Sequence, residues 1–256
     1  MLSYSRAGEP EDLLFVSEQA YFQHGKAIKG GIPICWPWFG ADPEAKGRPA
    51  HGFVRNRDWQ VLSTDMQQDH TLSVRLGIRS DAEMRAFWPH PFALTLEITV
   101  GSVLELALFS FNPDTQPLVI TQGLHSYFRV GDVARVRVLG LEGNSYIDKM
   151  DGGALKTQEG VVTVAGEVDR IYTGVGGELL IEDPVLERRI RIASEGSASA
   201  VVWNPWTATA AAMADLGDED YLRMLCVETT NAGPDAVNII PGENYRLAAR
   251  YSIERE

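Results

Sequence analysis

Two residues of this chain are suited to exchange protons near neutral pH. His125 lies in the aromatic segment TQGLHSYFRVGD (121–132), and Glu228 follows an apolar run in MLCVETTN (224–231). A carboxylate placed after a buried strand must be paired or must face a cavity, because burying an unpaired charge is costly. An imidazole and a carboxylate from distant parts of a chain can form a general acid–base pair. For His125 alone, a hydrogen-bonded packing role is the alternative interpretation.

Basic and aromatic residues gather in two loop-like segments earlier in the chain. Lys29 directly precedes GGIPICWPWFG (30–40), and HGFVRNRDW (51–59) contains two arginines, Arg55 and Arg57. Arginine binds phosphate through forked donors, and flat aromatic faces suit the C–H faces of sugar rings. We interpret the segment 30–40 as the rigid aromatic rim of a pocket, with Lys29 at its edge. Simple packing into the core is the alternative.

An acid–base pair, aromatic walls and a few cations indicate proton transfer on a phosphorylated sugar. The same residues would also serve a non-catalytic carbohydrate-binding module. A glycoside hydrolase needs two carboxylates, and only Asp169 accompanies Glu228 as a weaker candidate. The chain has no G-x-S-x-G serine-hydrolase motif, and TGVGGE (173–178) lacks the strand–turn–helix context of a dinucleotide site.

The amino-acid composition excludes several classes of binding partner. The 256 residues carry a formal net charge of −12, which argues against a nucleic-acid or anionic-membrane surface. No apolar run approaches the length needed to span a bilayer, and MLSYSRAGEPED lacks the order of a secretory signal. We therefore expect a cytoplasmic protein in which Cys35 and Cys226 are reduced and buried. No spacing of His or Cys predicts a zinc site, and we expect no metal or cofactor.

Alternation of apolar and polar residues is the dominant pattern of the chain. Gly101-Ser102 predicts a two-residue hairpin turn. Ser80 and Glu83 have capping-box spacing and predict a short helix over 80–87, and composition favours a second helix over 207–216. Many strands and few helices predict an all-β protein, a single large antiparallel sandwich or barrel. The clearest predicted strands are 71–79, 92–100, 103–112, 134–141, 188–194 and 244–253.

Six segments follow one another in a characteristic order along the chain: KAIKGGIPICWPWFG, HGFVRNRDW, GLHSYFRVGDV, VVWNPW, MADLGDEDY and MLCVETTNA. Together they resemble one known family, the glucose-6-phosphate 1-epimerases, or hexose-6-phosphate mutarotases, of the galactose mutarotase-like superfamily. The resemblance implies one aldose 1-epimerase-like domain over residues 1–256, with a β-supersandwich fold. It also implies interconversion of the α and β anomers of a hexose 6-phosphate, above all glucose 6-phosphate, without cofactor or metal. We expect a monomer.

The resemblance also implies roles for individual residues. The catalytic pair is His125 and Glu228, which at ordinary pKa values of about 6.5 and 4.3 suit an acid and a base. The phosphate is held by basic residues, and the sugar is contacted by polar and aromatic ones. The substrate-binding residues implied in this way are Lys29, Arg55, His51, Asp169 and Trp203.

Two departures from the family pattern affect these expectations. Most members have Arg where this chain has Lys29, and Lys keeps the charge but loses the fork, so we expect weaker phosphate binding or selectivity. Members usually have several dozen residues ahead of LLFVS (13–17), where this chain has 12. We therefore expect that some N-terminal strands of the family are lacking and that a sheet edge is exposed.

Overall fold

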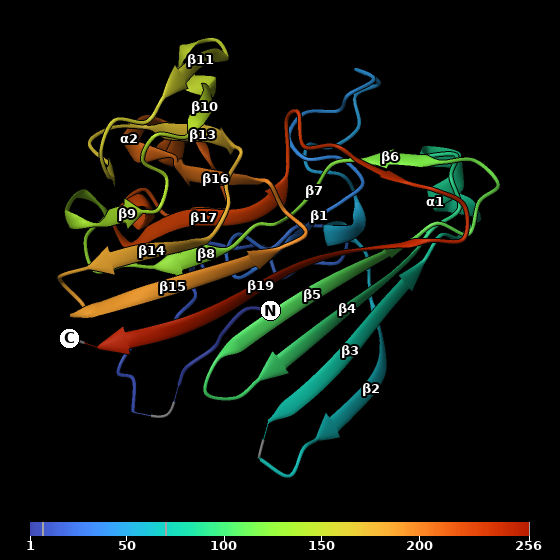
Figure 1. Ribbon diagram of the computed structural model, residues 1–256, viewed down its shortest axis with the longest axis horizontal. Coiled ribbons are helices and arrows are strands. Elements are labelled where there is room, and N and C mark those ends of the chain that lie inside the picture. The colour runs from blue at the N-terminus through green and yellow to red at the C-terminus, as the bar shows by residue number, and fades with distance from the viewer. Residues whose placement is uncertain (7, 70, 256) are drawn as a thin grey trace.

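Two antiparallel sheets make up most of the computed structural model (Figure 1). The structure describes residues 1–6, 8–69 and 71–255. The first sheet has eight strands, seven of which follow one another across the sheet while the eighth, β8, pairs with β17. In spatial order these strands are β1 (Ile34–Cys35), β7 (Gln122–Leu124), β17 (Met224–Asn231), β16 (Ser199–Asn204), β13 (Val168–Thr173), β10 (Ser145–Asp148) and β11 (Ala154–Thr157), with β8 (Tyr127–Arg129).

The second sheet has nine strands, and a separate two-stranded ribbon joins β18 (Val237–Ile239) to β6 (Leu118–Ile120). The long strands of the second sheet lie beneath the first sheet in the view of Figure 1. In spatial order they are β12 (Val162–Thr163), β9 (Arg137–Leu139), β14 (Glu178–Asp183), β15 (Arg188–Glu195), β19 (Asn244–Arg255), β5 (Leu104–Phe111), β4 (Ala93–Val100), β3 (Leu72–Arg79) and β2 (Gln60–Met66).

Helices are short and lie at the ends of strands. No helix in the described part of the chain is long and apolar enough to cross a membrane. The helices are α1 (Ala82–Phe87), α2 (Trp206–Ala212) and four 3-10 turns, Val54–Asn56, Val133–Arg135, Lys149–Asp151 and Asp220–Arg223. The predicted all-β architecture with few short helices is therefore confirmed.

Most predicted strands coincide with observed ones, but two details of the sequence interpretation are wrong. Only the centre of 134–141 is a strand, because Asp132 accepts a hydrogen bond from the Ala134 amide and begins a 3-10 turn. The hairpin between β4 and β5 has a three-residue loop, 101–103, because Val100 pairs with Leu104.

The start of α1 also differs from the capping-box prediction. The Asp81 carboxylate caps the helix by accepting from the Met84 amide at 2.7 Å. The Ser80 hydroxyl instead accepts a hydrogen bond from the Phe92 amide at 3.2 Å, which joins the helix to the start of β4. The second predicted helix exists but ends at Ala212, earlier than expected.

The central strand β17 is enclosed on both faces, and its residues alternate between two environments. Leu225 and Val227 belong to the main hydrophobic core, whereas Cys226 lies in a smaller cluster on the opposite face. Alternation along a strand puts Glu228 on the same face as Cys226. That face of the sheet carries the chemistry described below.

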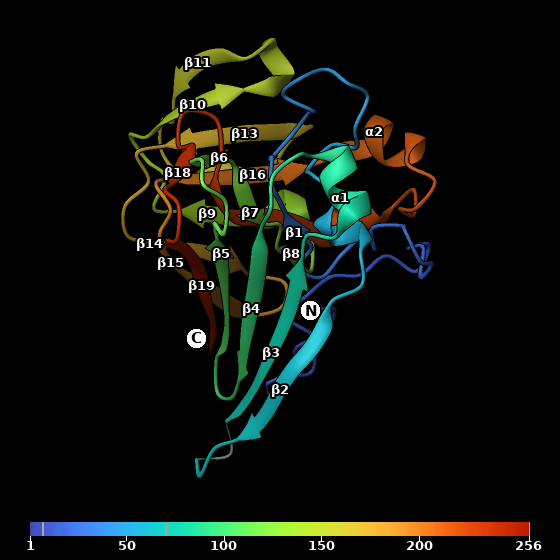
Figure 2. The same cartoon turned by 90° about the vertical axis from the view of Figure 1, so that its right-hand side faces the viewer.

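The strand β2 has the opposite character. It forms one edge of the second sheet and extends away from the body of the molecule (Figure 2). Six of its seven residues are exposed, including Val61 and Leu62. Its pairing with β3 shifts register between Val61 and Ser63, as at a β-bulge.

Candidate active site

One face of the first sheet brings together side chains from four strands. Trp203 on β16 pairs with Asp169 on β13 and with Cys226 on β17, and Cys226 pairs in turn with Tyr127 on β8. Residues directly opposite each other in neighbouring strands point to the same face. Side chains two residues apart on a strand point to the same face. Glu228, two residues beyond Cys226, therefore lies on this face as well.

A cavity of about 260 Å³ opens on this face. It brings together all seven residues that the sequence analysis assigned to catalysis or substrate binding. The seven are Lys29, His51, Arg55, His125, Asp169, Trp203 and Glu228, and the cavity is completed by Phe39, Tyr127, Lys149, Val201 and Met213.

The loop that carries His51 and Arg55 is held against the loop 30–40 by close backbone contact. Gly52 has a φ of +71°, and a Cβ there would lie 1.8 Å from the Trp36 carbonyl oxygen, so only glycine fits. The His51 amide donates to the Gly40 carbonyl at 2.7 Å, and the Gly40 amide donates to His51 Nδ1 at 3.4 Å. These contacts hold His51 at a φ of +62°, which non-glycine residues rarely adopt.

His125 and Glu228 meet at the base of the cavity. His125 Nδ1 lies 3.5 Å from Glu228 Oε1, and their side chains are only 8% and 1% exposed. The His125 ring stacks on Tyr127 at a centroid distance of 4.7 Å and meets Trp203 edge-to-face at 6.0 Å. The aromatic rings therefore fix the orientation of the imidazole beside the carboxyl group.

Burial shifts both groups away from their ordinary protonation behaviour. Desolvation is the main cause that lowers the pKa of His125 well below its usual value, with His51 and Arg55 adding to it. Desolvation also raises the pKa of Glu228 well above its usual value, and Asp169 adds to this. The sequence-based expectation that both groups titrate near ordinary values is therefore wrong, because neither strand pattern nor motif shows how completely water is excluded.

Two cations on one wall of the cavity have other partners in the protein. Lys29 Nζ lies 3.6 Å from Asp215 Oδ1 and 3.8 Å from Met213 Sδ. Arg55 donates through Nη2 to the Ala50 carbonyl at 2.9 Å, and its buried Nε has no hydrogen-bond partner among the described residues. The MADLGDEDY segment therefore contributes to the site by holding Lys29.

A third cation, Lys149, was not found by sequence reasoning. It lies in the turn between β10 and β11 and forms an ion pair of 3.1 Å with Asp169. Burial lowers the pKa of His51 to about 3, with contributions from Arg55, Lys149 and Lys29 in that order. His51 is therefore neutral and lies within the fields of all three cations. No motif surrounds Lys149 in the sequence, so only the fold reveals it.

The interpretation of the segment 30–40 as an aromatic rim is largely wrong. Trp36 and Trp38 are 0% and 3% exposed and belong to the main core, where Trp36 packs against Phe53, Trp88 and Phe92. Only Phe39 of this segment lines the cavity. Loop composition indicates rigid aromatics but does not show whether they face outward or inward.

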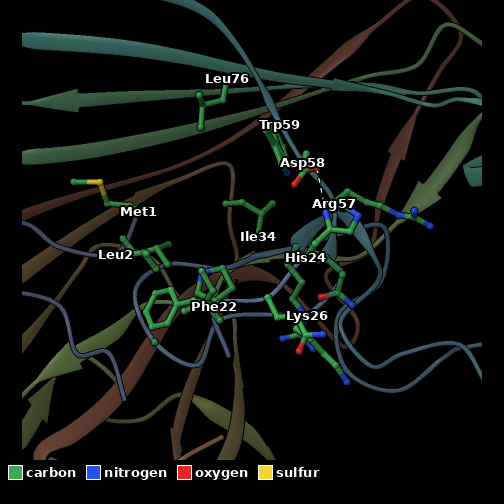
Figure 3. Close-up of a pocket in the computed structure, with 18 of the residues that line it drawn as sticks. Met1, Leu2, Phe22, His24, Lys26, Ile34, Arg57, Asp58, Trp59 and Leu76 are labelled. Carbon is green, nitrogen blue, oxygen red and sulfur yellow. Dashed lines mark ion pairs between the residues drawn. The ribbon is translucent and has the colours of Figure 1, made fainter. Parts of the chain in front are cut away.

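A second, larger cavity of about 520 Å³ lies beside the first, between the N-terminal segment and the second sheet. Apolar side chains such as Ile34, Trp59 and Leu76 line it, together with an ion pair between His24 and Asp58 (Figure 3). It holds none of the acid–base residues. Arg55 lines both cavities, so this guanidinium forms part of the wall between them.

One group of side chains beside the first cavity has the donor atoms of a metal site. One possible ligand atom from each of His125, Cys226 and Glu228 lies within 4.8 Å of the other two. Both Cys35 and Cys226 are free and buried, as predicted. The spacing of His and Cys along the chain did not predict this group, because Cys226 and Glu228 lie on β17 whereas His125 lies in the distant connection between β7 and β8.

Comparison with known proteins places the chain in a family. The model of the aldose 1-epimerase family matches residues 1–252. The chain belongs to this family. Membership identifies it as an isomerase of the mutarotase type, and the resemblance inferred from the six sequence segments is confirmed.

Similar proteins support the assignment at the level of sequence and of structure. A candidate glucose-6-phosphate 1-epimerase from Escherichia coli K12 is 37% identical over 233 residues, which cover 91% of this chain and 76% of the relative. The corresponding protein of Cenchrus ciliaris is 36% identical over 245 residues, covering 92% of this chain and 73% of its own. A crystal structure of a candidate mutarotase from Salmonella typhimurium has a TM-score of 0.92 at 32% identity, covering all of this chain and 84% of its own.

A more distant structure shows how widely the fold is shared. A galactose mutarotase related enzyme from Lactobacillus acidophilus has a TM-score of 0.75 at 12% identity, covering 97% of this chain and 89% of its own. At this identity the likeness concerns the fold alone. The predicted galactose mutarotase-like supersandwich is thus confirmed.

Proposed function

We propose that this aldose 1-epimerase interconverts the α and β anomers of a hexose 6-phosphate, above all glucose 6-phosphate. One observation carries the proposal: His125 and Glu228 meet at 3.5 Å at the base of a cavity whose wall carries Lys29 and Arg55. The cavity thus combines an acid–base pair with cations suited to a phosphate. Relatives at 36–37% identity that are named for glucose 6-phosphate support this substrate.

The chemistry is the opening and reclosure of a hemiacetal ring. Glu228, as a carboxylate, accepts the proton of the C1 hydroxyl while protonated His125 donates a proton to the ring oxygen. The bond from C1 to the ring oxygen breaks, and a free aldehyde forms at C1. Rotation about C1–C2 presents the other face of the aldehyde, and the two residues reverse their roles when the ring closes. General acid–base groups of this kind contribute about 10²–10⁴-fold each.

The pair needs one proton in total for this cycle. Glu228 as a carboxylate with protonated His125 holds the same number of protons as the two neutral groups that burial favours. The two forms differ by one proton transfer between atoms 3.5 Å apart. Ring opening moves one proton into the sugar and one out, so no proton has to come from solvent.

The remaining residues of the cavity bind the sugar in this proposal. Lys29 and Arg55 hold the phosphate, and Asp169 and His51 contact hydroxyl groups. The ring of Trp203 supplies a flat apolar face for the sugar. Binding of the phosphate supplies the free energy that positions the reacting carbon, C1, over the acid–base pair.

The two rival functions are less well supported by the same site. A binding module has no need of an imidazole and a carboxyl group that are buried side by side. A glycoside hydrolase would use Asp169 as its second carboxylate, but Asp169 is paired with Lys149 and its side chain is 23% exposed. Release of reducing sugar from an oligosaccharide would revive this alternative.

Anomer exchange measured by proton NMR tests the proposal. Exchange of glucose 6-phosphate and of free glucose is compared with and without the purified protein. Faster exchange of the phosphorylated sugar alone is the expected result. Equal acceleration of both sugars would contradict a phosphate clamp formed by Lys29 and Arg55. No acceleration by a folded protein would favour the binding module instead.

A matched pair of arginine variants tests the clamp directly. Arg55→Ala removes a cation from the cavity, and we expect KM for glucose 6-phosphate to rise roughly tenfold, as for the loss of one charge-assisted hydrogen bond. Arg57→Ala is the control, since Arg57 lies two residues on and pairs with Glu83 instead. A KM that is unchanged in Arg55→Ala, or raised equally in both variants, would exclude Arg55 from the clamp.

We also propose that the protein acts as a single-domain monomer in the cytoplasm. Two free, buried cysteines support a reducing compartment. Sedimentation of the purified protein at micromolar concentration tests the oligomeric state, and a dimer mass would contradict the monomer. Fractionation of cells that express the protein tests its location.

A further inference from the structure

We propose that His125, Cys226 and Glu228 bind a thiophilic divalent cation such as Zn²⁺, and that the bound ion blocks the epimerase. The thiol of Cys226 has no part in the proposed chemistry, yet it lies directly beside the acid–base pair. Metal binding depends only on the arrangement of these side chains. The blocking of activity rests in addition on the proposed function.

The sheet geometry brings the three donors together. Cys226 and Glu228 are two residues apart on β17, so their side chains lie on one face of the strand. His125 reaches the same face and lies 3.5 Å from Glu228. One donor atom from each of the three residues lies within 4.8 Å of the other two, so small side-chain rotations bring them within bonding distance of a single ion.

Two of the donor atoms are buried without a hydrogen bond, although one of them, His125 Nδ1, lies 3.5 Å from the other oxygen of Glu228. His125 Nδ1 and Glu228 Oε2 have no hydrogen-bond partner among the described residues, although the two side chains are only 8% and 1% exposed. Buried polar atoms are nearly always satisfied, so atoms that are not satisfied point to a ligand. An ion coordinated by both atoms would satisfy them, and Cys226 Sγ would supply the third bond.

The donor set selects the kind of ion. One sulfur, one imidazole nitrogen and one carboxylate oxygen suit Zn²⁺ or Co²⁺, whereas Mg²⁺ and Ca²⁺ prefer oxygen ligands alone. The cavity leaves the fourth tetrahedral position open to water. On binding, bonds form from the metal to sulfur, nitrogen and oxygen, and two protons pass to solvent, the thiol proton of Cys226 and the single proton held by the His125–Glu228 pair, with no change of oxidation state.

Occupation of the site removes both reacting groups at once. An ion bound by His125 and Glu228 leaves neither free to exchange protons with the sugar. Lys29 and Arg55 line the same cavity and repel a cation, so we expect weaker binding than at a closed structural zinc site. Reversible inhibition is therefore expected, with activity recovered when a chelator removes the ion.

Cobalt absorption tests the binding without reference to activity. Apo-protein is titrated with Co²⁺, and the thiolate-to-cobalt charge-transfer band is followed in the wild type and in Cys226→Ser. Cys35→Ser is the matched control, since Cys35 is also free and buried but stands outside the trio. We expect a saturable band at one ion per chain in the wild type and Cys35→Ser, displaced by Zn²⁺ and missing from Cys226→Ser. The absence of a band in the wild type, or its persistence in Cys226→Ser, would overturn the site.

Inhibition is measured on the same proteins. The Zn²⁺ concentration that halves the anomer exchange of glucose 6-phosphate should rise at least tenfold in Cys226→Ser and stay unchanged in Cys35→Ser. Cys226→Ala serves as a second variant in case the serine hydroxyl perturbs folding. A cobalt band with activity that Zn²⁺ leaves unchanged would reject the blocking role. A cobalt band in a protein that catalyses no exchange would instead reject the proposed function and leave the metal site standing.

Discussion

The strands β17 and β2 are similar in length but have opposite surroundings. All eight residues of β17 are buried, whereas six of the seven residues of β2 are exposed. Exclusion of water around β17 is what shifts the pKa of Glu228 upward and leaves its carboxyl oxygen without a partner. No residue of an open edge strand could be perturbed in this way, because water would solvate its charge. The comparison shows that the shifted protonation of the His125–Glu228 pair depends on a strand that is enclosed on both faces.

The largest effect is expected from the functional face of β17. Glu228→Gln removes the base, and we expect kcat for anomer exchange to fall by about 10²–10⁴-fold. His125→Ala should lose a similar factor. The thermal unfolding temperature of each variant is the control for folding. A rate near that of the wild type in either variant would show that its assigned role is wrong.

A leucine-to-alanine substitution on each of the two strands tests the same contrast through the free energy of unfolding. Leu225 is fully buried in the main core, so Leu225→Ala should lower the free energy of unfolding by about 2–5 kcal/mol. Leu62 on β2 is 54% exposed, and Leu62→Ala should change this free energy by no more than about 0.5 kcal/mol. Urea unfolding of both variants gives the two values, and similar losses would contradict the contrast.

The smallest effect concerns the electrostatic field at Glu228. Lys149 is the main neighbour that lowers the pKa of Glu228, opposing burial and Asp169. The acid–base pair works with one proton, so loss of the proton from Glu228 ends activity, and the pKa of Glu228 sets the basic limb of kcat/KM. Lys149→Met should therefore raise this pKa further and move the basic limb to higher pH.

Lys156→Met is the matched control for the field of Lys149. Lys156 lies on the same hairpin and pairs with Asp148 and Asp151. Its replacement should perturb the hairpin without moving the basic limb. A limb that stays in place in Lys149→Met, or that moves equally in both variants, would show that the field of Lys149 does not reach the carboxyl group.

Much of the fold was predictable because the alternation of apolar and polar residues that marks a strand is visible within a short stretch of sequence. The alternation in 92–100 and 244–253 identified strands that the structure confirms as β4 and β19. The errors arose where one side chain decided the local structure. Asp132 turned the start of a predicted strand into a 3-10 turn, and Asp81 capped α1 in place of Ser80.

The candidate site was predictable to the extent that it lies in recognisable segments. All seven residues assigned from the sequence line one cavity. Lys149 was missed because it is an isolated cation in a hairpin turn, and its pairing with Asp169 exists only in three dimensions. Trp36 and Trp38 were misplaced because loop composition does not show which side of a loop faces the core.

The alternation along β17 also constrains how genes for this fold can change in length. Loss of one codon ahead of Glu228 in β17 would exchange the two faces of the remaining strand, so that Thr229 would take the place of Glu228 in the cavity. The strand β2 already contains a register shift between Val61 and Ser63, and its side chains face water. We therefore expect insertions and deletions of a single codon to be selected against in the segment 224–231 and tolerated in the segment 60–66.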